Sequence, residues 1–141
     1  MDPHLKVESC YNTGAVTSTY LSKEYMPSAG GIFTHSQNYS CSNSSIEVIN
    51  CYNTGTISAG TKSYLGGIAG IIDSDSANVT VKNCYNIGSV QGATEYAAID
   101  YEEDAGTYIF DEDFGESGAI AGWVCHYYDG DTPQINIKNC Y

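Results

Sequence analysis

The sequence predicts an all-β protein, a right-handed parallel β-helix or β-solenoid with loop insertions and about three to four coils. Three observations favour this fold class. The pattern Cys-Tyr-Asn-x-Gly occurs three times, and a fourth copy begins where the chain ends. A short Gly-rich segment lies between the copies. Val, Ile, Thr and Tyr dominate between Gly and Asn, which is typical of strands and turns.

The copies follow a longer template that starts at Leu5, Ile46, Val79 and Ile135, so the repeated units differ in length. Repeats of this kind are typical of solenoids and propellers, and a propeller needs a more regular unit with four strands. We therefore expect the whole chain to be one β-solenoid fragment of a longer repeat protein, with insertions at about 17–45 and 91–117. Its units are 5–45, 46–78, 79–134 and the incomplete 135–141.

Each template begins as a strand and continues into a turn. Apolar residues alternate with polar ones, as at Ile46 and Val48, which predicts a strand with one buried face. Asn-x-Gly then predicts a tight turn, because Asn and Gly tolerate positive φ.

No unit can bury its apolar face alone, so we expect successive units to stack about 4.8 Å apart, like residue over like. Stacked Asn side chains can then bond to one another, as in amide ladders. The expected structural columns are Cys10, Cys51, Cys84 and Cys140; Asn12, Asn53 and Asn86; and Gly14, Gly55 and Gly88.

The second repeated segment reads AGGIF at 29–33, LGGIAG at 65–70 and SGAIAG at 117–122. Together with Val-x-Val-x-Asn-Cys-Tyr-Asn-x-Gly-x-Val, it resembles the GLUG-type repeat of large bacterial surface proteins, best over 65–92. The resemblance implies a β-solenoid in an exported, adhesin-like protein at the cell surface or outside the cell. It implies no catalytic residues, and it implies that neighbouring repeats of the parent chain are partners.

Charge excludes two classes of partner. The chain has 17 acidic residues against 5 Lys and no Arg, a formal charge of -12. Nucleic acids and anionic membrane surfaces both require clustered Lys and Arg, so neither is an expected partner. No apolar run is long enough to span a bilayer, so membrane insertion is not expected. The first residues do not resemble a signal peptide, which says nothing about a longer parent protein.

The six cysteines allow two interpretations. Stacked neighbours would come within reach of a disulfide, but side chains in one column run parallel whereas a bridge requires them to converge. We therefore favour buried thiols that act as small hydrophobic residues. No Cys-x-x-Cys pair or His spacing indicates zinc.

The acidic segment 100–116 is a candidate calcium site, with Asp111, Asp113 and Glu116 as the ligands. The full twelve-residue calcium loop is absent, and a solvated acidic loop is the favoured interpretation. Smaller acidic groups occur at 73–75 and 129–131 and are interpreted in the same way. Apart from this calcium, no cofactor is expected.

Tyrosines are the candidate binding residues. Tyr101, Tyr108, Tyr127 and Tyr128 lie in or near the acidic segments and could contact a glycan or a protein of a host or cell wall. The tyrosines of the repeats would form a further column, which packing on a half-exposed sheet explains equally well.

An enzyme is the least favoured class. Polysaccharide elimination needs a base with cations, and hydrolysis needs paired carboxylates with one raised pKa. The Lys residues are dispersed, and the acidic pairs lie in segments expected to be solvated. We therefore expect a non-catalytic structural and adhesive segment. The alternatives are a carbohydrate- or calcium-binding module that uses 100–116, and a degenerate polysaccharide-active β-helix.

Overall fold

The computed structural model describes residues 4–19, 27–36, 44–73, 77–92, 117–125 and 135–141. These residues form sixteen short strands and no helix. None of them provides a helical segment of the length and hydropathy that crossing a bilayer requires. The strands are β1 (His4–Glu8), β2 (Tyr11–Asn12), β3 (Val16–Ser18), β4 (Ser28–Gly30), β5 (Phe33–Ser36), β6 (Ser44–Ile49), β7 (Tyr52–Asn53), β8 (Ile57–Ala59), β9 (Tyr64–Gly66), β10 (Ala69–Asp73), β11 (Ala77–Lys82), β12 (Tyr85–Asn86), β13 (Val90–Gln91), β14 (Ser117–Gly118), β15 (Ala121–Cys125) and β16 (Ile135–Lys138).

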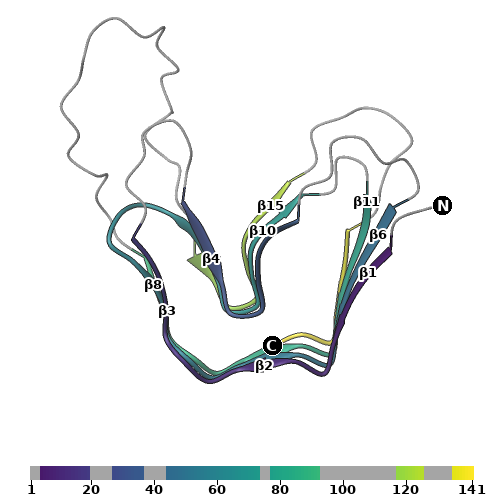
Figure 1. Ribbon diagram of the computed structural model, residues 1–141, viewed down its shortest axis with the longest axis horizontal. Helices are drawn as coiled ribbons and strands as arrows, with labels where there is room; N and C mark the ends of the chain where they lie inside the picture. The colour runs from purple at the N-terminus through teal and green to yellow at the C-terminus, as the bar shows by residue number, and fades with distance from the viewer. Residues whose placement is uncertain (1–3, 20–26, 37–43, 74–76, 93–116, 126–134) are drawn as a thin grey trace, which may run out of the picture.

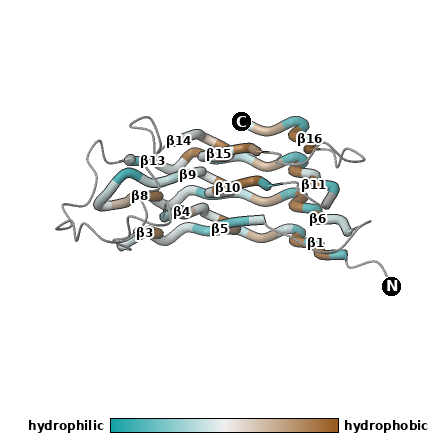
Figure 2. The backbone as a smooth tube through the Cα atoms, turned by 90° about the horizontal axis from the view of Figure 1, so that it is seen from above, coloured by the Kyte–Doolittle hydropathy of each residue, from teal (hydrophilic) through white to brown (hydrophobic). Residues whose placement is uncertain are grey.

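The strands form five parallel sheets that run side by side along the stack (Figure 1, Figure 2). One sheet has the order β1-β6-β11-β16, and the others have the orders β2-β7-β12, β3-β8-β13, β4-β9-β14 and β5-β10-β15. Each pass of the chain contributes one strand to every sheet, and such a pass is called a layer below. Layer 1 contains β1–β5, layer 2 β6–β10 and layer 3 β11–β15, and β16 lies on β11. The prediction of an all-β chain with stacked parallel sheets is confirmed.

The strand register follows the sequence repeat. Leu5 pairs with Ile46, Ile46 with Val79, and Val79 with Ile135. These pairs join the first apolar positions of the aligned copies. The copies are unequally spaced in the sequence, yet they stay in register, because the extra residues lie between the paired strands.

Two apolar clusters fill the space between an outer and an inner wall. In Figure 1, the sheets of β1, β2 and β3 trace the outer wall, and the sheets of β4 and β10 lie inside it. One cluster includes Val48, Ile68 and Val81 and joins β6 and β11 to the region of β10. The other includes Ile57 and Leu65 and joins β8 to β9. The outer wall therefore packs against the inner wall in two places, β6 and β11 against the region of β10, and β8 against β9.

The Gly-rich segments make the bend between the two inner sheets. A Cβ on Gly66 would overlap the carbonyl oxygen of Ala69, and the same holds for Gly30 against Phe33 and for Gly118 against Ala121. The chain therefore requires glycine here because its own backbone returns too closely for a side chain.

The range 17–45 was expected to be a loop insertion, but it includes regular parts of the stack. β4 and β5 lie within it and pair with β9 and β10. Within that range, 20–26 and 37–43 lie outside the described residues, as does 93–116 of the expected insertion 91–117.

Candidate functional site: the stacked Cys-Tyr-Asn-x-Gly segments

The repeated segments lie directly over one another in the outer wall. β2, β7 and β12 carry Tyr11, Tyr52 and Tyr85 in one register. The amide of Tyr52 donates to the carbonyl of Cys10 at 3.1 Å, and the amide of Tyr85 donates to that of Cys51 at 3.1 Å. The amide of Tyr141 donates to the carbonyl of Cys84 at 3.2 Å. Each position of the pattern thus forms a column that runs through the layers.

The corner between the first two sheets lies before the cysteine. Among the described non-glycine residues, positive φ occurs at Ser9, Asn50, Asn83 and Asn139, with values of 53–56°. The expected positive-φ turn at Asn-x-Gly is therefore wrong in position, because no described glycine has φ in the left-handed range. Asn suits the observed corner because its short polar side chain tolerates the left-handed conformation.

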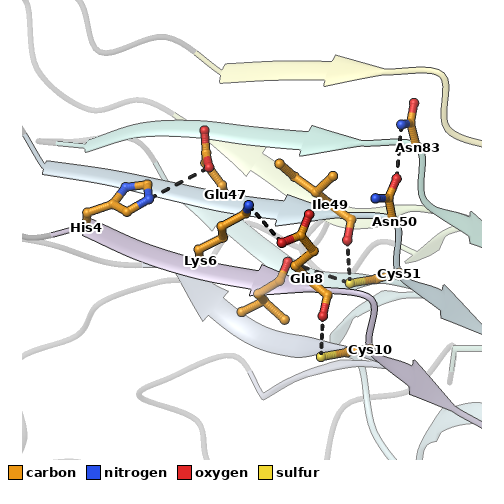
Figure 3. A network of polar contacts seen from close by, with 10 residues as sticks. His4, Lys6, Glu8, Cys10, Glu47, Ile49, Asn50, Cys51 and Asn83 are labelled. Carbon is orange, nitrogen blue, oxygen red and sulfur yellow. Dashed lines mark hydrogen bonds and ion pairs between the residues drawn. The ribbon is translucent and has the colours of Figure 1, made fainter.

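The corner side chains form an exposed amide ladder. Asn83 donates to Asn50 at 3.1 Å, and Asn139 donates to Asn83 at 3.2 Å. Figure 3 shows the contact between Asn83 and Asn50. This ladder was missed from the sequence, although the Asn before each Cys in three copies was a signal that could have revealed it.

The cysteine column points into the larger apolar cluster. Cys51 and Cys84 are fully buried, and Cys10 is exposed at the edge of layer 1. The thiol of Cys51 donates to the carbonyl of Ile49 at 3.2 Å, as drawn in Figure 3. Burial raises the pKa of the Cys51 thiol and raises that of Cys84 to about 11. Cys10, Cys51, Cys84 and Cys140 form no disulfide, and their raised pKa keeps the two buried thiols, Cys51 and Cys84, protonated at neutral pH.

The tyrosine column lies on the outer side of the same strands. Consecutive rings from Tyr11 to Tyr52, Tyr85 and Tyr141 have centroids 5.3, 5.0 and 5.6 Å apart, with interplanar angles of 9°, 5° and 11°. Tyr11 and Tyr141 are 65% and 74% exposed, and the two middle tyrosines are half-buried. The column is a continuous, solvent-facing stack of four phenols.

The asparagine column turns inward and is a second amide ladder. Asn12 donates to Asn53, and Asn53 donates to Asn86, both at 2.8 Å. Asn53 also donates to the carbonyl of Gly55 at 2.8 Å, and it accepts the amide of Gly55 at 3.1 Å. Asn53 is 0% exposed, so each of its polar atoms is satisfied by the column and its own turn.

Glycines on the inner wall make room for this ladder. A Cβ on Gly31 would lie 2.7 Å from Cγ of Asn53, and one on Gly67 would overlap Cγ of Asn86. The Gly-Gly-Ile segment and the Cys-Tyr-Asn segment are therefore two sides of one contact, which explains why they repeat together.

The glycine column is required by stacking. A Cβ on Gly55 would overlap the carbonyl oxygen of Gly14, and one on Gly88 would overlap that of Gly55. A Cβ on Gly14, in layer 1, would meet only Oδ1 of Asn12 at 3.7 Å.

A separate polar cluster lies where the inner strands β5 and β10 end. Asp73 is 3% exposed, although its acidic segment was expected to be solvated. Its backbone amide donates to Oγ of Ser36 at 2.9 Å, and its Oδ2 lies 4.0 Å from Nε2 of His35. Burial lowers the pKa of His35, and the nearby carboxylate partly opposes this effect. This cluster ties layer 1 to layer 2.

The candidate ligand-binding residues lie outside the described residues. They are Asp111, Asp113, Glu116, Tyr101, Tyr108, Tyr127 and Tyr128. Within the described part of the chain, no group of three or more His, Cys, Asp or Glu side chains is arranged to hold a metal ion.

Comparison with known proteins gave no match to a protein-family model, a curated protein or a solved structure. The resemblance to GLUG-type repeats therefore stays a prediction from the quoted motifs.

Proposed function

We propose that the chain is a right-handed parallel β-solenoid that serves as a non-catalytic structural and adhesive segment of an exported bacterial surface protein. The observation that carries this proposal is the continuous register of the repeat, in which equivalent residues of successive layers pair. The right hand follows from the strong preference of parallel strand crossovers for that hand. The GLUG-type resemblance supplies the expected location at the cell surface.

The use of the buried polar groups supports a structural role. In the described residues, every buried side-chain nitrogen or oxygen has a hydrogen-bond partner. Asn53 and Ser36 direct their bonds to neighbouring layers. Polar groups that are fully used in this way hold the layers together and fix their register.

Stretching single molecules tests the mechanical part of the proposal. Equivalent residues of successive layers are 41, 33 and 56 residues apart, as the pairs of the two amide ladders show. A rod that opens layer by layer should release these lengths of chain in separate steps. At about 3.4 Å per extended residue, the contour-length increments are about 14, about 11 and about 19 nm. Featureless extension without force peaks would contradict a rod that resists force.

Surface display tests the adhesive part. The chain is fused to an outer-surface anchor on non-adherent cells, and retention under flow is measured on glycan-coated and matrix-coated surfaces. Cells that carry the anchor alone are the control. Retention equal to the control on every surface would remove adhesion and leave only the scaffold role.

A further inference from the structure

The tyrosine column combines close spacing, parallel rings and access to solvent. Its three ring pairs have centroid distances of 5.0–5.6 Å and interplanar angles of at most 11°. Tyr11 and Tyr141 at its ends are largely exposed. Packing alone would accept Phe or a β-branched residue at a half-exposed strand position, whereas all four copies have Tyr.

We propose that this column is a site of oxidative tyrosine coupling, in which neighbouring tyrosines of successive layers become joined as dityrosine. The oxidant is a one-electron oxidant of the haem peroxidase class with hydrogen peroxide. Each of two phenols loses one electron and one proton, and the two phenoxyl radicals form a carbon–carbon bond between their ortho ring carbons. After both rings regain aromaticity, two hydrogens have left the protein, and one peroxide has been reduced to two waters.

The strand register favours coupling between neighbours. Tyr52 and Tyr85 are direct partners in parallel strands, so their backbones stay one strand spacing apart in the folded protein. Bond formation requires the rings to turn from face-to-face to edge-to-edge. That rotation about χ2 is soft for tyrosine, and solvent on the outer side leaves room for it. A tethered neighbour also has a far higher effective concentration than a second molecule in dilute solution.

The other described tyrosine, Tyr64, lies in a different environment. It is 3% exposed, and its ring stacks on that of Trp123 at 4.7 Å rather than on another phenol. It therefore provides a matched control for coupling at a buried position.

The product would be a covalent bond between layers on the outer wall. Tyr52 and Tyr85 are 33 residues apart in the chain, the same separation as that of the neighbouring Asn53 and Asn86. Tyr11 and Tyr52 are likewise 41 residues apart, as are the asparagines that follow them. Bonds that close loops of this length restrict the unfolded chain and stabilise the folded stack.

The test treats the purified chain with haem peroxidase and hydrogen peroxide at low protein concentration. Dityrosine fluorescence, the loss of two hydrogens per bond by mass spectrometry, and mapping of the joined peptides are measured. The proposal predicts monomeric products joined between adjacent tyrosines of the column. The Tyr52→Phe/Tyr85→Phe double variant keeps the stacked rings but removes every adjacent tyrosine pair, so it should lose these products. Tyr64→Phe should retain them.

Two further measurements keep the outcome clear. Circular dichroism verifies that the double variant is folded, and oxidation of the chain in concentrated urea should abolish the preference for column pairs. The proposal is overturned if the double variant forms as much monomeric dityrosine as the wild type. It is also overturned if the joined peptides derive from tyrosines outside the column, or if only intermolecular products form.

Discussion

The glycine column allows one chemical change to be made at equivalent positions with opposite expected results. Gly14 and Gly55 follow Asn-Thr in the same repeated segment. Neither has φ in the left-handed range, so adding a methyl group strains neither backbone through φ. The two positions differ in what a Cβ would meet, since a Cβ on Gly55 points at layer 1 and a Cβ on Gly14 meets no other layer.

Gly55→Ala should destabilise the protein. Its Cβ would overlap the carbonyl oxygen of Gly14 and lie 2.7 Å from the carbonyl carbon. Carbon atoms pack best at about 3.5–4.0 Å, so the two layers must separate by about 0.8 Å or more. Overpacking of this kind costs about 1–3 kcal/mol.

The separation also weakens hydrogen bonds between the layers. The backbone amide of Thr54 donates to the carbonyl of Asn12, and that of Val16 donates to the carbonyl of Thr56, both at 2.9 Å. Each such bond contributes about 1 kcal/mol. Replacing Gly by Ala returns about 0.4–1 kcal/mol by restricting the unfolded chain. The net loss for Gly55→Ala is then about 2–4 kcal/mol, from the same three effects.

Gly14→Ala should instead stabilise the protein by about 0.4–1 kcal/mol, because its Cβ meets nothing closer than ordinary contact distance. Urea unfolding, followed by far-ultraviolet circular dichroism and by the fluorescence of the single Trp123, measures both free energies. With a urea dependence of about 2 kcal/mol per molar, the Gly55→Ala midpoint falls by about 1–2 M. Equal changes in the two variants would refute the claim that stacking places glycine here.

Three further predictions follow from the columns. Asn53→Ala should cost at least about 2–3 kcal/mol in urea unfolding, because it removes the four hydrogen bonds of a fully buried side chain, two of them to the backbone of the buried Gly55. Asn83→Gly in the exposed ladder keeps the positive-φ corner and should cost under about 1 kcal/mol; equal losses would contradict the buried ladder. The raised pKa of Cys84 means that its stabilising effect is complete below pH 9.0 and disappears as pH approaches about 11, so unfolding free energy should fall in that interval. This fall should be smaller in Cys84→Ala, and an unchanged fall would assign it to other groups. A dityrosine bond between Tyr52 and Tyr85 should raise the unfolding free energy by about 3.7 kcal/mol in the loop-entropy approximation, and no rise in the cross-linked monomer would show that the bond distorts the stack.

The repeat carried most of the information about the fold. Alternation at Ile46 and Val48 indicated one buried face, and the identity of the copies indicated that the faces stack. Parallel pairing follows because like residues can lie over like only when successive strands run the same way. The inner wall was harder to predict, since β4 and β5 have only three and four residues and neither alternates apolar with polar residues.

The role of individual residues was less visible. A glycine in a sequence can indicate either positive φ or close approach, and only the neighbouring layer shows that Gly55 is needed for close approach. The positive φ of Asn50 was not predicted, because each repeat contains two Asn residues. Asn50 forms the corner with positive φ, whereas Asn53 turns its side chain inward. Asp73 appeared solvated because its partners, the buried Ser36 and the exposed His35, lie far away in the chain, in the preceding layer.

The central claim is that the repeated segments lie in parallel columns, and hydrogen bonds between layers test it most directly. Nuclear magnetic resonance detects scalar coupling across a backbone hydrogen bond, from the amide nitrogen to the carbonyl carbon. The structure predicts couplings from Tyr52 to Cys10, from Tyr85 to Cys51 and from Tyr141 to Cys84. A spectrum with strand couplings that connect these segments in antiparallel order, or that connect none of them, would contradict the stacked arrangement.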